Sequence, residues 1–177
     1  IPGLHTVRIS RDGIRVFPRI SQPEEPEEPE EPEEMENGPH PSLKHRLSTG
    51  VGELDEMLGG GIPASYSVLV AGPSGSGKTV LSNQFIVEGI RCGEPGVIAV
   101  FEKRPINYLE TTPHGAEFKQ LVAAGKLEIL YLRPLDLSID ETMVAIREAV
   151  LRVGAKRAVI DSLSGLELAL APTFRQD

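Results

Sequence analysis

Gly72-Pro73-Ser74-Gly75-Ser76-Gly77-Lys78-Thr79 decides the fold, because it fits the pattern G-x-x-x-x-G-K-[ST] of a P-loop, or Walker A motif. An apolar run at 67–71 precedes it and predicts a buried strand, and residues 80–91 carry apolar side chains at helical spacing. The glycines let the backbone approach an anion, Lys78 can reach the β- and γ-phosphates, and the Thr79 hydroxyl is a natural Mg²⁺ ligand. A glycine-rich turn without a ligand is the alternative. The Lys-Thr pair between strand and helix favours binding of a nucleoside triphosphate.

Downstream of this motif, predicted strands alternate with predicted helices. The strands are expected at 97–101, 127–132 and 157–161, and the helices at 114–124 and from a Ser138/Glu141 capping box to Gly154. This alternation predicts an α/β fold with a doubly wound, mainly parallel sheet and flanking helices. Ligands of such sheets bind at the carboxyl ends of the strands, where the P-loop should lie.

Two acidic residues follow predicted strands and are therefore expected near the P-loop. Asp161 ends an apolar strand, as in the Walker B arrangement, in which the acid holds Mg²⁺ directly or through water. Capping of the strand end is the structural alternative for Asp161. Glu102 follows the strand at 97–101, where a carboxylate could orient or deprotonate the attacking water. From the residues alone, a solvated strand end explains Glu102 equally well.

The N-terminal part of the chain has a different composition. Residues 4–17 alternate around an Asp12-Gly13 turn and predict a β-hairpin. Residues 22–36 repeat Pro-Glu-Glu, which predicts a solvated spacer, with an acidic docking segment as the alternative. Residues 51–58 then predict a short amphipathic helix with Val51, Leu54, Met57 and Leu58 on its apolar face.

Composition excludes several classes of function. The net charge is −8, but nine of the 26 acidic residues lie within 24–36, so the remainder is nearly neutral and has no basic footprint for nucleic acid. Cys92 is the only cysteine, so no intrachain disulfide forms and a reducing compartment is expected. The four histidines have no metal-ligand spacing. No apolar run is long enough to span a membrane and no signal peptide is evident, so we expect a cytoplasmic protein.

Several stretches together resemble the KaiC branch of the RecA-like P-loop ATPases, the circadian clock protein family. They are Leu47 to Gly50, Leu54-Asp55, Leu58 to Pro63, Gly72 to Thr79, Phe101-Glu102, Asp136 to Glu141 and Ile160 to Leu166. The resemblance covers about residues 43–177. It implies a RecA-like fold, ATP and Mg²⁺ as cofactors, a homohexameric ring, ATP hydrolysis and, in some members, Ser/Thr autophosphorylation, in a signalling or clock-type role with protein partners.

The resemblance also implies roles for single residues. Glu102 matches the first of the family's paired catalytic glutamates, but Lys103 stands at the second, which argues against kinase-level activity. Ser65 stands where family members usually carry Gly. The chain ends shortly after Asp161, so we expect a fold truncated after the Walker B strand, with the P-loop strand lacking its neighbour in the sheet and the fragment inactive by itself.

The expected organisation has three parts. Residues 1–20 form a hairpin that looks like the end of a preceding KaiC-type module, 21–42 form an acidic linker, and 43–177 form the N-terminal part of the ATPase domain. Two rival functions remain: a RecA-type DNA-dependent ATPase, and a module that senses ATP without turnover. The near-neutral charge disfavours the first, whereas Lys103 and the expected truncation favour the second.

Overall fold

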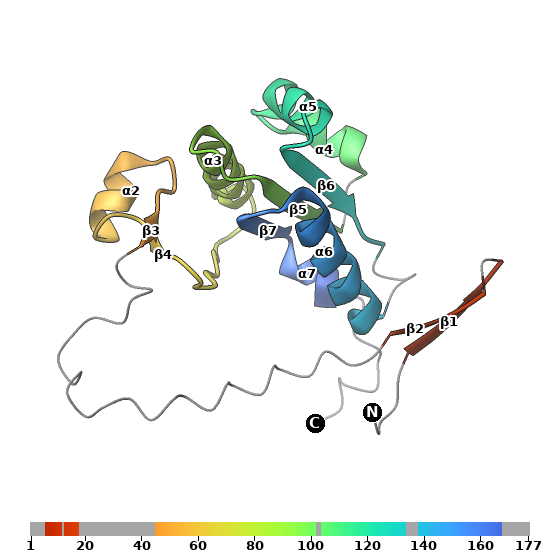
Figure 1. Cartoon of the computed structure of the whole chain (residues 1–177). Coiled ribbons are helices and arrows are strands. Elements are labelled where there is room, and N and C mark those ends of the chain that lie inside the picture. Colours follow the sequence, from red (N-terminus) through yellow and green to blue (C-terminus); the bar gives the residue numbers. More distant parts are fainter. Residues whose placement is uncertain (1–5, 12, 18–44, 102–103, 134–137, 168–177) are drawn as a thin grey trace, which may run out of the picture.

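The computed structural model describes residues 6–11, 13–17, 45–101, 104–133 and 138–167. They form a parallel sheet with helices on both faces, and an N-terminal hairpin lies beside one of these helices (Figure 1). The linker expected at 21–42 lies outside the described residues. No helix within the described ranges combines the length and apolarity needed to cross a membrane.

The central strand of the sheet is β5, Gly96–Val100, which is buried along its whole length. It pairs in parallel with β6, Leu127–Tyr131, on one side and with β7, Arg157–Asp161, on the other. A continuous apolar run is what a strand covered on both faces requires. The sequence prediction is confirmed for all three strands: β7 has the predicted bounds, β6 ends one residue earlier than predicted, and β5 is shifted by one residue at both ends.

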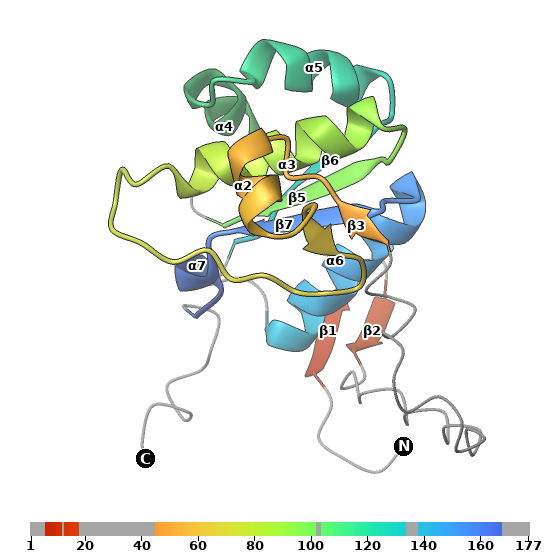
Figure 2. The same cartoon turned by 90° about the vertical axis from the view of Figure 1, so that its left-hand side faces the viewer.

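Helices cover both faces of this sheet. On one face lie α3 (Lys78–Arg91), α4 (Pro105–Thr111) and α5 (Gly115–Ala123), and on the other lies α6, Ile139–Val153 (Figures 1 and 2). The crossover from β5 to β6 runs across the sheet in one direction and that from β6 to β7 in the other. Because parallel crossovers are right-handed, this reversal puts their helices on opposite faces. The predicted doubly wound α/β fold is confirmed.

The core has two halves, because side chains of β5 alternate between the faces of the sheet. Ile98 and Val100 belong to a cluster with α3, α4 and α5. Ala99 and the following Phe101 belong to a second cluster beneath α6. The final helix α7, Leu163–Glu167, packs closely on the end of β5, where a side chain at Gly165 would collide with Phe101.

The predicted capping box opens α6. The Glu141 N–H donates to the Ser138 hydroxyl, and the Ser138 N–H donates to the Glu141 carboxylate at 2.8 Å. Gly154, with φ 67°, ends the helix as predicted. The predicted helix at 114–124 is also confirmed as α5. By contrast, α4 is absent from the elements predicted above, although Pro105 stands at its N-terminal position, which proline favours.

The strand predicted at 67–71 is wrong for this structure. These residues adopt no strand, and the apolar side chains expected to be buried are exposed, with Leu69 at 73% and Val68 at 58%. A strand needs a ladder partner, and within the described ranges nothing pairs with the outer edge of β7. Without a ladder partner among the described residues, this segment does not form a strand.

A small unit precedes that segment (Figure 2). Strand β3 (Arg46–Leu47) pairs antiparallel with β4 (Ile62–Pro63), and α2 (Gly52–Met57) lies between them in the chain. The predicted amphipathic helix is present, but its apolar face is not covered, since Met57 is 84% exposed and α2 has no buried residue. This short helix is held through polar contacts near Asp55 instead, which are described below.

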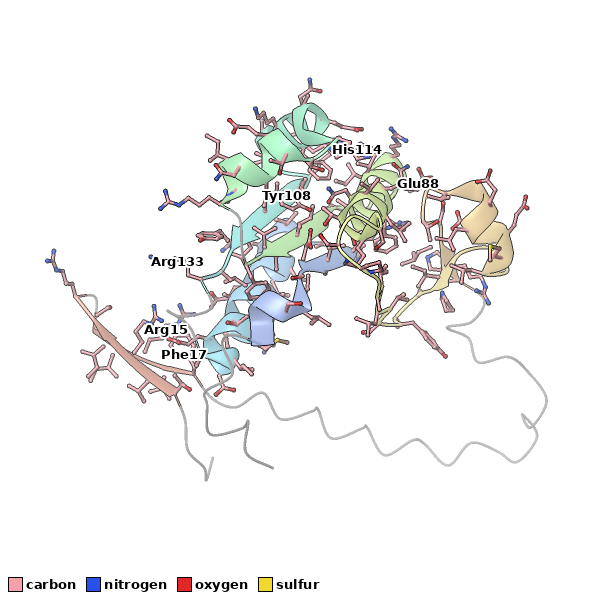
Figure 3. The ribbon with its side chains drawn as sticks, turned by 180° about the vertical axis from the view of Figure 1, so that it is seen from behind. Arg15, Phe17, Glu88, Tyr108, His114 and Arg133 are labelled. Carbon is pink, nitrogen blue, oxygen red and sulfur yellow. The ribbon has the colours of Figure 1, made fainter. Side chains whose placement is uncertain are left out.

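The N-terminal hairpin is confirmed, with β1 (Thr6–Ser10) antiparallel to β2 (Gly13–Phe17). Its polar face lies against α6: Arg8 Nε donates to Glu141 at 2.7 Å, and Arg15 pairs with Glu148. Figure 3 shows Arg15 and Phe17 on this side of the hairpin. The other face exposes four apolar side chains, Val7, Ile9, Ile14 and Val16.

Arg157, the first residue of β7, is buried at 3% exposure and joins four parts of the chain. Its Nε donates to Glu94 at 2.7 Å, and Nη1 donates to the carbonyls of Ser48 at 2.6 Å and Phe85 at 2.9 Å. The guanidinium also lies 4.4 Å from the Phe85 ring centroid. Gly89 in α3 makes room for it, because a Cβ there would collide with the arginine side chain.

We predict that Arg157→Leu lowers the free energy of unfolding by about 3 kcal/mol or more, because it removes a buried charge that donates to two partly buried carbonyls and a carboxylate. Urea unfolding of the intact protein measures this. Arg152→Leu is the matched control, since Arg152 pairs with Glu128 at the surface and should change stability by less than about 1 kcal/mol. Equal effects of the two substitutions would contradict the role given to Arg157.

Candidate functional site

The P-loop, Gly72 to Thr79, leads directly into α3. Gly77 is the N-cap with φ 91°, and Gly75 has φ 80°, so both take the left-handed conformation that glycine permits. At Gly72, an added side chain would meet the Ser76 hydroxyl at 2.7 Å. No side chain caps the helix, so the amides of its first turn remain available to an anion at the positive end of the helix dipole.

The two P-loop residues with functional side chains lie at the start of α3. Lys78 Nζ donates to the carbonyls of Gly72 and Pro73, both at 2.8 Å, which holds the ammonium over the loop. Thr79 follows and is half-buried. The remaining P-loop residues, Pro73, Ser74 and Ser76 among them, are exposed. The loop thus offers a cation, a hydroxyl and backbone donors at one helix end.

Asp161 ends β7 at the edge of the sheet where α3 begins (Figure 2). Val159, two residues earlier, packs in the core cluster beneath α3 and α4. Since strand side chains alternate, Asp161 points to that same face. Its carboxylate lies near Tyr108, whose hydroxyl donates to Asn83 in α3. The structure therefore brings Asp161 to the side of the sheet that carries the P-loop helix.

The donor set suits Mg²⁺ bound together with phosphates. A threonine hydroxyl and an aspartate carboxylate are hard oxygen ligands, and Mg²⁺ is usually held by one or two carboxylates plus the phosphates of its substrate. No group of three or more His, Cys, Asp or Glu side chains that could hold a metal alone occurs within the described ranges. Thr79 and Asp161 fit a shared magnesium–nucleotide site rather than a protein-only cage.

The predicted catalytic Glu102 and its neighbour Lys103 lie outside the described residues. The catalytic role predicted for Glu102 and the effect predicted for Lys103 therefore rest on the sequence alone.

Residues 47–61, at the start of the stretch that resembles the KaiC family, have structural roles. Asp55 accepts from the Ser48 hydroxyl at 2.7 Å, the Thr49 hydroxyl at 2.7 Å and the Thr49 N–H at 2.8 Å. Gly61, with φ 107°, passes so close to Leu47 that a side chain would collide with its carbonyl. These contacts close the unit around α2, which Arg157 then joins to β7 through the Ser48 carbonyl.

Ser65 also has a structural explanation. Its φ is 69°, in the left-handed region, and it is the one non-glycine residue with positive φ among those described. Glycine adopts this conformation without steric cost, whereas other L-residues pay about 1–2 kcal/mol. Serine at position 65 therefore adds backbone strain to this turn, compared with the glycine that family members usually carry.

A pocket of about 400 Å³ lies elsewhere, between the hairpin and α6. Arg8, Arg15, Glu141 and Glu148 are among its lining residues, and these are already paired across the hairpin–helix contact. None of the predicted site residues lines it. The candidate site described above lies instead at the P-loop edge of the sheet.

The three-layer fold, the P-loop at the start of α3 and the aspartate that ends β7 define a RecA-like P-loop ATPase. A family model described as the KaiC ATPase matches residues 47–177. The chain belongs to this family and carries its ATP-binding module.

Curated relatives agree with this assignment. A UPF0273 protein of Methanopyrus kandleri is 35% identical over 137 residues, covering 68% of this chain and 54% of the relative. The circadian clock oscillator protein KaiC of Prochlorococcus marinus is 33% identical over 133 residues, covering 74% and 27%. KaiC of Rippkaea orientalis is 29% identical over 180 residues, covering 98% and 31%. The chain spans about half or less of the length of these relatives.

Sequence reasoning missed the buried polar residues behind the site, namely Asn83, Tyr108 and Arg157. For two of these three residues, the sequence pattern contains a signal that could have indicated burial. Asn83 lies four residues after Thr79 and three before Ile86, on the buried face of α3, where an asparagine is unusual. Arg157 opens an otherwise apolar strand.

The pKa of Asp55 reflects its contacts with Ser48, Thr49 and Arg157. Burial raises it, but the hydrogen bonds from Ser48 and Thr49 and the charge of Arg157 outweigh burial and hold it below its ordinary value of 3.8. A carboxyl whose pKa is lower in the folded state contributes stability that is complete above the ordinary value. This contribution is lost as the pH falls through the folded-state pKa.

We predict that Asp55→Asn destabilises the protein at pH 7 by on the order of 1 kcal/mol, and that this difference from wild type shrinks as the pH falls below 3.8. Urea unfolding at a series of pH values measures it. Glu53→Gln, an exposed change in the same helix, is the control and should show little effect. A difference that stays constant down to the lowest pH would contradict the assignment.

Proposed function

We propose that this chain binds ATP with Mg²⁺ and hydrolyses it as part of a cytoplasmic ring with a signalling or clock-type role. The observation that carries the proposal is the uncapped, glycine-opened start of α3, with Lys78 over the loop and Asp161 on the same side of the sheet. In this proposal, backbone amides and Lys78 bind the phosphates, and Thr79 and Asp161 hold Mg²⁺.

Glu102 completes the proposed chemistry. Its carboxylate orients or deprotonates the water that attacks the γ-phosphorus, and the phosphate–ADP bond breaks as the new bond to oxygen forms. Ser/Thr autophosphorylation would use the same bound ATP, with a protein hydroxyl in place of water. Lys103 beside Glu102 favours the ionised, less basic carboxylate, and therefore we assign hydrolysis as the main reaction.

Assembly and chain organisation are part of the same proposal. Residues 1–20 end a preceding module, 21–42 connect, and 43–177 form the ATPase domain of a homohexameric ring. The Rippkaea orientalis KaiC match, which covers 98% of this chain, supports the view that the hairpin and the acidic segment have counterparts inside a longer protein. The Arg8–Glu141 and Arg15–Glu148 pairs would then join consecutive modules.

Two rival functions are tested against this one. A DNA-dependent ATPase would need a basic surface, and the chain outside residues 24–36 is nearly neutral. A module that senses ATP without turnover would bind the nucleotide through the same P-loop and release no phosphate.

We predict that Lys78→Ala lowers ATP affinity about 100-fold or more, because it removes a charge-assisted contact to the phosphates. The fold should persist, since the Lys78 side chain bonds only to carbonyls of the loop. Fluorescence titration with an ATP analogue measures affinity, and thermal unfolding checks the fold. Lys119→Ala, at an exposed position of α5, is the control. Unchanged ATP affinity in Lys78→Ala would contradict the assignment of the P-loop as the ATP-binding site.

We predict that Glu102→Gln keeps ATP affinity and lowers turnover by about 10²–10⁴-fold, the usual share of a positioned base. Lys103→Glu should raise turnover, because it removes the positive charge beside the carboxylate. Steady-state phosphate release by the intact protein compares the three forms. Hydrolysis of ATP by Glu102→Gln at the wild-type rate would show that Glu102 has no catalytic role and is only a solvated residue at a strand end.

A further inference from the structure

The contact between the N-terminal hairpin and α6 is made mainly by charged side chains (Figure 1). Arg8 Nε donates to Glu141 Oε1 at 2.7 Å, and Arg15 pairs with Glu148. Phe17 is the one buried residue of the two described hairpin strands, and a pocket of about 400 Å³ lies between the hairpin and α6. An isolated two-stranded hairpin is only marginally stable in water, so β1 and β2 depend on this contact. Partly exposed ion pairs contribute modestly and are screened by salt, so the contact can open.

Glu141 takes part in two contacts at once. Its Oε1 accepts from Arg8 of β1, and its Oε2 accepts from the Ser138 N–H at 2.8 Å, which is one half of the capping box of α6. The residue is 6% exposed. Because the two oxygens belong to one planar carboxylate, they turn together. The orientation that closes the capping box is therefore the orientation that presents Oε1 to the hairpin.

The first turn of α6 lies toward the edge of the sheet that carries the candidate site. Strands β6 and β7 both run parallel to β5, so α6 must return the chain from the carboxyl end of β6 to the amino end of β7. The helix therefore starts toward the carboxyl edge, where Asp161 ends β7, but on the face opposite α3. The hairpin thus contacts the module toward its functional edge.

We propose that Glu141 couples docking of the hairpin to the closed first turn of α6, so that the hairpin acts as a releasable latch on this turn. Opening of the capping box turns the carboxylate away from Arg8, and release of the hairpin removes the partner that holds Oε1. A coupling of this kind is reciprocal, so the loss of either contact weakens the other. The coupling is independent of ATP chemistry and goes beyond the proposed function.

The test measures hydrogen exchange by mass spectrometry in the intact protein, at residues 13–17 of the hairpin and 138–146 of α6. Ser138→Ala removes the hydroxyl that accepts from the Glu141 N–H, and Ser138 does not line the pocket between hairpin and helix. We expect exchange in the hairpin to become about fivefold faster, because loss of an N-cap loosens the first turn that orients Glu141. Ser138→Thr keeps a capping hydroxyl and should match wild type. Gly154→Ala strains the other end of α6, at φ 67°, and should leave the hairpin unchanged.

The reciprocal experiment starts from the hairpin. Arg8→Gln removes the charge that faces Glu141, and we expect faster exchange both in the hairpin and at the start of α6. Arg15→Glu should release the hairpin by repelling Glu148, and the swapped pair Arg15→Glu/Glu148→Arg should restore its protection.

Three results would overturn the inference. The first is wild-type exchange of the hairpin in Ser138→Ala, and the second is equal acceleration by Ser138→Ala and Gly154→Ala. The third is an Arg8→Gln variant in which the hairpin exchanges faster while the start of α6 does not. The first two would mean that the cap does not control docking, and the third that docking does not control the cap.

Discussion

The buried guanidinium of Arg157 is the contact on which the arrangement of the site depends. It binds the Ser48 carbonyl before α2, the Phe85 carbonyl within α3 and the Glu94 carboxylate before β5, while its own backbone starts β7. A planar, permanently charged group with several donors can satisfy three acceptors in one place, which a lysine could not do in the same geometry. Arg157 thereby fixes α3, which carries the P-loop, relative to β7, which carries Asp161.

The two ends of β7 have complementary roles. At its start, Arg157 fastens the strand to α3 and to the unit around α2. At its end, Asp161 lies beside the polar chain of Tyr108 and Asn83 that returns to α3 one turn after Thr79. Arg157 therefore holds the strand and the helix together at the start of β7, and Asp161 lies at the opposite end of the strand, on the side of the sheet that carries Thr79. The segment at 67–71 has no such support, and its apolar side chains are exposed.

The sequence predicted what depends on local patterns. The three strands of the sheet, the capping box of α6, the hairpin around Asp12-Gly13 and the helix after the P-loop all follow from spacing of apolar residues and from turn chemistry. It failed where the outcome depends on distant partners. The run at 67–71 has strand composition but pairs with none of the described strands, and Met57 has helical spacing but is exposed. Asn83 and Tyr108 meet only once the fold brings α3 and α4 together, and Glu102 lies outside the described residues.

The central claim is that the edge formed by the P-loop and Asp161 turns over ATP. The most direct measurement is steady-state phosphate release by the intact protein with ATP and Mg²⁺, with and without single-stranded DNA. The account predicts release that requires Mg²⁺ and does not respond to DNA. Binding of ATP with no release of phosphate would make the protein a nucleotide sensor, and release that depends on DNA would place it among the DNA-dependent ATPases. Either result would contradict the account.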